Sequence, residues 1–129
     1  MDSFHLKMQL KILAGDEPVL GPGLVTLLTH IQTTGSLRRA SKAMGMSYAK
    51  CWRILAHAEN TFGKSLTKKT IGGPQGGSSC LTPLALNLMA RYEAFSTQSA
   101  AAVQQLYETI FLSDPDLSKI LAPTSTPKE

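Results

Sequence analysis

The sequence predicts a mostly α-helical fold with a small β component. Apolar residues recur every three or four positions between residues 22 and 62 and again between 83 and 112, which is the period of amphipathic helices. Shorter segments near residues 5–12 and 66–82 have the pattern or composition of strands, and glycine, serine and proline lie between the segments. The 129 residues, 43% of them hydrophobic, are typical of one domain with an appended element.

Composition excludes several classes of protein. No run of about 18 apolar residues is present, so we expect no transmembrane helix. The N-terminus, MDSFHLKMQLKIL, alternates charged and apolar residues and lacks the apolar stretch of a signal peptide. We therefore expect a cytoplasmic protein without a membrane partner, in which Cys51 and Cys80 stay reduced.

Positive charge is concentrated in the middle of the chain. Eight basic residues lie between Ser36 and Lys69, and Glu59 is the only acid there, so this segment carries +7 within a chain of net charge +4. Such a patch is typical of proteins that bind polyanions. The alternative is a solvated basic face without a partner.

The N-terminal pattern predicts a half-buried strand over residues 5–12, because Leu6, Met8, Leu10 and Ile12 alternate with polar residues. Turn residues follow, and Val19-Leu20 is expected to form a short return strand.

Three helices are predicted next. The first begins near Pro22 and ends at residues 33–35; Ser36 caps the second, SLRRASKAM, which Gly45 ends; Ser47 caps the third, SYAKCWRILAHAENTF. Two short capped helices joined by a glycine turn predict a helix-turn-helix, and small Ala40 and Ala43 suit a close crossing of its helices.

The third helix has two different faces when its residues are placed 100° apart. Cys51, Leu55, Ala58 and Phe62 form an apolar face, and Ala49, Arg53, Ala56 and Asn60 form the opposite face. Lys50 and His57 flank one edge, and Tyr48 and Trp52 flank the other. A small, basic, hydrogen-bonding face is what a helix in the major groove of DNA requires.

The glycine-rich stretch IGGPQGGSSCLT, residues 71–82, is expected to be the tip and return strand of a hairpin. It lacks the Gly-Lys-Ser/Thr of a Walker loop, and GGPQGG does not have the spacing of a dinucleotide fingerprint. We interpret residues 68–82 as a wing whose glycines allow close approach to a phosphate backbone, with Lys68 and Lys69 on one side.

A long helix is predicted over residues 83–112, with Thr82 as its cap and Pro83 in its first turn. A helix this long cannot bury its apolar stripe against one small domain, so we expect it to pair with the same helix of a second chain. The expected domains are 1–82, 83–112 and a flexible tail, 113–129. The expected dimer contacts are Leu84, Leu88, Tyr92, Phe95, Val103, Leu106 and Ile110.

The run GSLRRASKAMGMSYAKCWRILAHAEN, then KKTIGGPQGGSSCLT, then the long helix, resembles the N-terminal domain of the molybdate-responsive ModE regulators. More distantly it is similar to the winged helix-turn-helix of LysR-type regulators. The resemblance covers about residues 6–111 and implies a winged-helix domain that binds double-stranded DNA as a homodimer and regulates transcription. Regulators of this family continue into a C-terminal molybdate-binding region, for which 129 residues leave no room. The resemblance therefore implies a link to molybdate-responsive genes but not the sensing region, and the chain is either a stand-alone DNA-binding version or takes its signal from elsewhere.

The expected DNA contacts come from the two helices and the wing. Arg53 is expected to reach a guanine edge or a phosphate, and Lys50 a phosphate. Tyr48 either contacts DNA or packs on Trp52, whereas Trp52 is expected to be structural. The full set is Ser36, Arg38, Arg39, Ser47, Tyr48, Ala49, Lys50, Arg53, His57, Lys68, Lys69, Gly73, Gln75 and Gly76.

Catalytic and metal sites are not predicted. Cys51 lies on the apolar face of its helix, and its spacing to His57, Cys80 and His30 is unlike that of zinc ligands. No nucleophile with a base is discernible, so we expect neither an enzyme nor a cofactor. Two other functions stay open: an oxyanion binder that uses the wing, and a winged helix that binds proteins instead of DNA.

Overall fold

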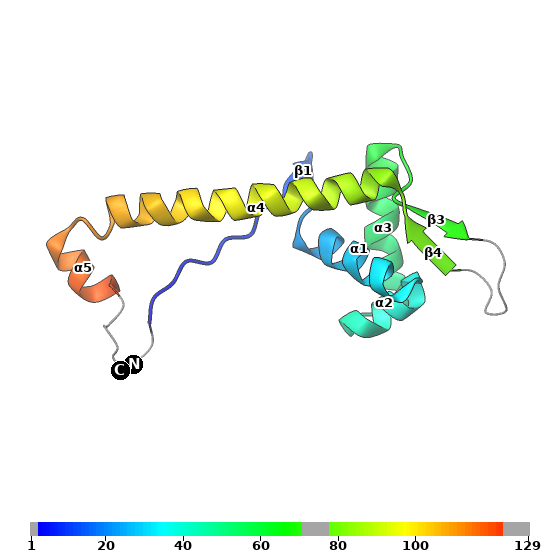
Figure 1. Cartoon of the computed structure of the whole chain (residues 1–129), viewed down its shortest axis with the longest axis horizontal. Coiled ribbons are helices and arrows are strands. Elements are labelled where there is room, and N and C mark those ends of the chain that lie inside the picture. Colours follow the sequence, from blue (N-terminus) through cyan, green and yellow to red (C-terminus); the bar gives the residue numbers. More distant parts are fainter. Residues whose placement is uncertain (1–2, 71–77, 123–129) are drawn as a thin grey trace. The chain divides into compact units, whose positions relative to one another are not determined.

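The computed structural model describes residues 3–70 and 78–122. The order of elements is β1-β2-α1-α2-α3-β3-β4-α4-α5, which confirms a mostly α fold with two small antiparallel sheets. The chain divides into two compact units, one formed by Gln9–Glu93 and the other by the described residues of Met1–Met8 and Ala94–Glu129. In Figure 1, helices α1 to α3 of the first unit cluster beside the β3–β4 hairpin. Within the described ranges, no helix is long and apolar enough to cross a membrane.

The N-terminal hairpin is shorter than the sequence predicts. Strand β1 covers only Ile12–Ala14 and pairs with β2, Glu17–Leu20, which confirms the return strand. The strand prediction for residues 5–12 is wrong, because residues 3–11 form no strand. An alternating pattern makes a strand only where a neighbouring strand accepts its hydrogen bonds. The carbonyl oxygen of Leu10 instead accepts a hydrogen bond from the Tyr92 hydroxyl at 2.8 Å.

The three predicted helices are confirmed, with their caps. Helix α1 covers Pro22–Thr34, α2 covers Leu37–Met44 and α3 covers Tyr48–Phe62. The Ser36 and Ser47 side chains accept hydrogen bonds from the backbone amides of Arg39 and Lys50. Gly45, at the joint between α2 and α3, has a φ of 66°, a left-handed conformation that favours glycine.

The core lies where α1 meets α2 and α3. Leu27, Leu28 and Ile31 of α1 are fully buried, as is Cys51 of α3. Leu37, Ala40 and Met44 of α2 face the core, but of the two alanines expected at the crossing of the helices only Ala40 is buried and Ala43 is exposed. At 100° per residue, Ala43 falls outside the inward-facing stripe of α2, which consists of residues 37, 40, 41 and 44. Buried Ser41 belongs to that stripe, and its hydroxyl donates to the Arg38 carbonyl at 2.7 Å.

The predicted wing is present. Strand β3, Thr67–Thr70, pairs antiparallel with β4, Ser78–Leu81, so that Lys68 faces Cys80 and Lys69 faces Ser79 across the ladder. The Ser79 amide also donates to the Gly35 carbonyl at 2.6 Å. This hydrogen bond ties the wing to the turn between α1 and α2.

Leu66 joins α3, the wing and the long helix α4. Its side chain is fully buried, and its amide donates to a Glu59 carboxylate oxygen at 2.8 Å. Its carbonyl accepts from the Thr82 amide at 3.0 Å. The Thr82 hydroxyl donates to the Ser65 carbonyl at 2.9 Å and accepts from the Ala85 amide at 3.3 Å, so Thr82 caps α4 as predicted.

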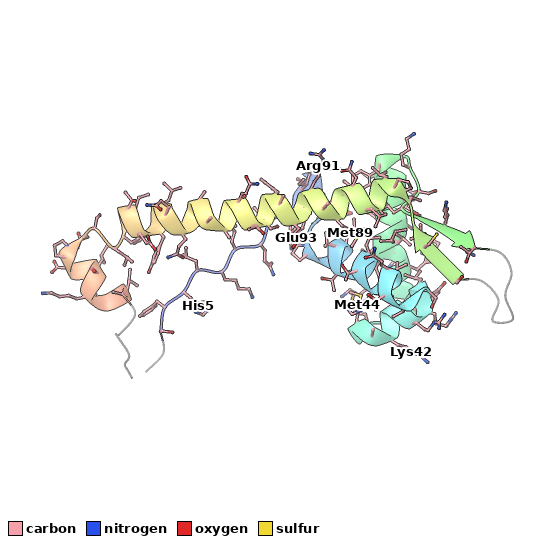
Figure 2. All side chains as sticks on the ribbon, viewed as in Figure 1. His5, Lys42, Met44, Met89, Arg91 and Glu93 are labelled. Atoms are coloured by element: carbon pink, nitrogen blue, oxygen red, sulfur yellow. The ribbon has the colours of Figure 1, made fainter. Side chains whose placement is uncertain are left out.

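Helix α4, Pro83–Ile110, is a single helix of 28 residues and therefore about 42 Å long. Its first turns pack on the core through Leu84, Leu88, Tyr92 and Met89, which is labelled in Figure 2. The expectation of a flexible tail from residue 113 differs from the structure, in which Pro115–Leu121 form helix α5. Asp114 caps α5 by accepting from two backbone amides, a signal of the kind that the sequence contained at Ser36.

Replacing Thr82 by valine should remove the cap of α4 and the hydroxyl bond to Ser65 while keeping the shape of the side chain. We expect Thr82→Val to lower the free energy of unfolding by about 1 kcal/mol, the usual contribution of a helix cap. Urea unfolding followed by circular dichroism measures the change. Thr97→Val, at an exposed position within the same helix, is the control, and equal effects of the two substitutions would contradict the role given to Thr82.

Candidate nucleic-acid interface

Helix α3 has the two faces that its sequence predicts. On the apolar face, Cys51, Leu55 and Ala58 are buried and Phe62 is half-buried. On the opposite face, Ala49, Arg53 and Asn60 are exposed and Ala56 is half-buried, and Lys50 is exposed at the edge. Burial raises the pKa of the Cys51 thiol, although the charge of Lys50 opposes this, and the thiol is therefore a core group, as expected. The basic, small-residue face of α3 is free to meet a ligand.

Trp52 does not have the structural role that its sequence position predicts. Its side chain is 55% exposed, because it lies 100° around α3 from Cys51, at the edge of the buried face. Tyr48, one turn earlier, is 40% exposed. The guanidinium of Arg38 lies over the Tyr48 ring, with its central carbon 4.4 Å from the ring centroid. This is a cation–π contact. Tyr48 and Trp52 therefore add two aromatic surfaces to the exposed side of α3.

A cleft separates α3 from the wing. It has a volume of about 440 Å³ and lies between α1, α2, α3 and the start and end of the wing. We call it the wing cleft. It brings together four of the predicted DNA-binding residues from three elements, with Trp52 beside them: Ser36, Arg38, Tyr48 and Lys69. The half-buried Glu59 also lines the cleft, so two cations and several hydroxyl groups surround one carboxylate there. Cationic and hydroxyl side chains on a concave surface suit a phosphate backbone.

A second cavity, of about 420 Å³, lies on the other edge of α3, between that helix and the segment from Lys11 to Leu24. We call it the hairpin cavity. Lys50, Arg53 and His57 of α3 line it, and Lys11 joins them from the residue before β1. Lys11 is not among the DNA contacts predicted from the sequence. The alternating pattern of residues 5–12 placed it only on the solvent-facing side of a strand. The hairpin is what brings this lysine beside α3.

The one acidic side chain of the basic segment has a structural role. The Glu59 carboxylate accepts from the amide of Leu66 and, at 3.4 Å, from that of Thr67. Two amide donors satisfy much of its negative charge at the base of the wing. The acid therefore holds the wing against α3.

The other predicted DNA contacts fall into three groups. Ser36 and Ser47 are helix caps whose hydroxyl groups can still donate a hydrogen bond, and Arg39 also donates through its Nε to Ser36 at 3.3 Å. Lys68 and Lys69 are exposed on β3. Gly73, Gln75 and Gly76 lie outside the described residues.

The predicted dimer residues differ in how free they are. Leu84, Leu88 and Tyr92 pack partly against the core of their own chain. Val103 is half-buried, whereas Phe95, Leu106 and Ile110 are 50%, 56% and 63% exposed. The second half of α4 thus carries the apolar side chains that are most available to a partner.

No candidate metal site is found in residues 3–70 and 78–122. In these ranges no group of three or more His, Cys, Asp or Glu residues is placed to hold an ion. Cys51 and Cys80 are both free thiols.

Known proteins similar to this chain include several named ModE. Over 123 residues the chain is 30% identical to the DNA-binding transcriptional dual regulator ModE of Escherichia coli K12. This match covers 93% of this chain and 42% of that protein. Over 86 residues the chain is 30% identical to the molybdenum transport protein ModE of Azotobacter vinelandii. This match covers 67% of this chain and 32% of that protein. The chain is thus a relative of ModE transcriptional regulators, which confirms the resemblance, and it spans less than half the length of these relatives.

No protein-family model matches the chain. Among solved structures, ArgP from Mycobacterium tuberculosis is similar with a TM-score of 0.48 and 15% identity, over 68% of this chain and 31% of that one.

Replacing Glu59 by alanine should leave the amide of buried Leu66 without its acceptor. We expect Glu59→Ala to lower the free energy of unfolding by about 1–3 kcal/mol, the cost of an unsatisfied buried donor. We also expect faster hydrogen exchange at the Leu66 and Thr67 amides. Glu108→Ala is the control, since Glu108 accepts only from exposed Gln104 on α4. Unchanged exchange at Leu66 in Glu59→Ala would show that the carboxylate does not hold the wing.

Proposed function

We propose that this chain is a sequence-specific DNA-binding transcription regulator that acts as a homodimer. The observation that carries the proposal is the exposed face of α3, where Ala49 and Arg53 lie opposite the buried face of the same helix and exposed Lys50 lies at one edge. Relatives named as transcriptional regulators, which match most of the chain, support it.

In this proposal α3 enters the major groove, which is about 12 Å wide and admits a helix. The small side chain of Ala49 lets the helix approach the bases closely. Arg53, in the middle of the exposed face, donates to a guanine through its guanidinium, and Lys50 contacts a neighbouring phosphate.

The wing contacts the sugar–phosphate backbone or the minor groove. The exposed amines of Lys68 and Lys69 supply charge there, and the wing cleft offers hydroxyl and guanidinium donors beside them. The hydrogen bond from Ser79 to Gly35 supports a fixed position of the wing relative to the helix-turn-helix, because it joins the two directly.

The homodimer forms through α4. Exposed Phe95, Leu106 and Ile110 are apolar, and their spacing of three or four residues and its multiples keeps them on one side of the helix. Burying them against a second copy removes apolar surface from water. Two copies present two α3 helices, which requires an operator of two-fold symmetry. The domain division at residues 82 and 112 belongs to this proposal.

The regulated genes are linked to molybdenum in this proposal. Two of the relatives are named for molybdenum transport, one of them from Herbaspirillum seropedicae with 41% identity over 64 residues. Selecting bound duplexes from a random pool, with and without molybdate, tests both parts: a symmetric enriched site supports the regulator, and a molybdate-dependent change supports the link.

Substituting Arg53 by alanine removes the proposed base contact. We expect Arg53→Ala to weaken binding to the selected operator by about 1–3 kcal/mol and to relax the preference at one base pair. Fluorescence anisotropy with the operator and single-base variants measures both. Arg91→Ala is the control, because this substitution removes the same charge from an exposed position on α4 instead of α3. Equal losses in the two variants would mean that Arg53 acts only as a general charge.

A charge on the exposed half of α4 should dissociate the dimer. We expect Leu106→Glu to shift the chain from dimer to monomer in analytical ultracentrifugation, since two carboxylates would then be buried against apolar surface. Gln105→Glu introduces the same charge at the neighbouring exposed position and should leave the dimer intact. A Leu106→Glu variant that stays dimeric would place the interface elsewhere.

A further inference from the structure

The hairpin cavity concentrates positive charge in a concave surface. Lys11, Lys50, Arg53 and His57 line it, and none of the described residues that line it is acidic. Its floor is apolar and comes from Pro18, Val19 and Ile54. Cations that converge on a hollow with low-dielectric walls strengthen one another's attraction for an anion.

Lys11 is held at this position by close packing on Gly21. A Cβ atom added to Gly21 would lie 3.1 Å from Cγ of Lys11 and 3.4 Å from the Leu10 carbonyl oxygen. The φ of Gly21 is −174°, an extended conformation that any residue adopts, so the requirement at position 21 is space. The absence of a side chain at Gly21 therefore lets Lys11 lie against the start of α1, at the rim of the cavity.

His57 supplies an independent sign that the cavity takes a ligand. Its Nε2 atom is buried and has no hydrogen-bond partner among the described residues. Buried polar atoms are nearly always hydrogen-bonded, and an exception requires an explanation. The His57 ring lines the cavity, although Nε2 itself has almost no open surface, so a rotation of the ring toward a hydrogen-bonding ligand there would provide the missing partner.

The start of α1 adds to this environment without defining it. The N-cap is Gly21, which has no side chain to accept from the first-turn amides. Those amides and the positive end of the helix dipole favour an anion nearby.

We infer that the hairpin cavity is a site for a phosphate-type oxyanion and that, in the DNA complex, a backbone phosphate of the duplex occupies it. This inference rests on the proposed function for the source of the phosphate. Two features favour a nucleic-acid backbone over a free ion. Lys50 and Arg53 belong both to the cavity and to the exposed face of α3, and the apolar floor offers a surface for a sugar.

The salt dependence of DNA binding tests the source. Each phosphate contact contributes about 0.9 to the slope of log K against log salt concentration, so Lys11→Ala should lower the slope by about that amount. The loss of affinity should be similar for every duplex sequence, because Lys11 contacts no base. Lys7→Ala removes a lysine from the same N-terminal segment and should leave the slope unchanged.

Two further measurements test the site itself. His57→Phe keeps an aromatic ring but removes the unpartnered nitrogen, so it should weaken DNA binding several-fold while the melting temperature stays equal or rises. A merely structural role for His57 would lower the melting temperature. In the absence of DNA, inorganic phosphate added to the full chain should shift the amide resonances of Gly23 and Leu24 and the ring resonances of His57.

The outcomes separate the two sources and the two proposals. A lower slope for Lys11→Ala supports a duplex phosphate, and phosphate-induced shifts with an unchanged slope support the site with a free oxyanion as its ligand. If the wild-type chain binds no duplex but phosphate causes the shifts, the site stands and the proposed function fails. Equal slopes for Lys11→Ala, Lys7→Ala and wild type, together with no shifts, would overturn the inference.

Discussion

The relative placement of α3, the wing and the start of α4 depends on the backbone of Leu66. Its amide is bound by Glu59 of α3 and its carbonyl by the first residue before α4, while its side chain fills the core. Three elements that must act together, namely α3, the wing and α4, are therefore joined through one peptide segment. Because the amide and the carbonyl are both satisfied, neither the wing nor α4 can shift without breaking a buried hydrogen bond.

This junction also explains how a segment of net charge +7 accommodates an acid. Glu59 lines the wing cleft with Arg38 and Lys69, but its carboxylate is half-buried and accepts from two amides at the base of the wing, which satisfies part of its negative charge. The positive charges remain on either side of α3, with Arg38 and Lys69 at the wing cleft and Lys11 and Lys50 at the hairpin cavity. Helix α3 thus lies between two cationic hollows, an arrangement that suits a helix in a groove between two phosphate strands.

The features that the sequence predicts well are those that local chemistry decides. The caps at Ser36, Ser47 and Thr82 each depend on a side chain and an amide three residues later, and the faces of α3 follow from helical rotation alone. The features that it predicts wrongly depend on neighbours distant in sequence. Of residues 5–12 only Ile12 pairs with another strand, and Trp52 is 55% exposed where it lines the wing cleft. The place of Lys11 beside α3 required the contact with Gly21, which no periodicity indicates.

The exposure of Trp52 and Tyr48 favours a role in binding over a role in folding. Burying a large side chain stabilises a fold by about 1.5–3 kcal/mol, and these two rings forgo much of that contribution. A single exposed apolar residue is ordinary, but both rings flank one edge of the exposed face of α3 and line the wing cleft. Arg38 lies over the Tyr48 ring, so the ring also limits the positions available to a guanidinium at the cleft. In a complex with DNA, the rings would contact sugar and base edges while the cations beside them contact phosphates. The same surface would then combine apolar contacts, which do not depend on salt, with charge contacts, which do.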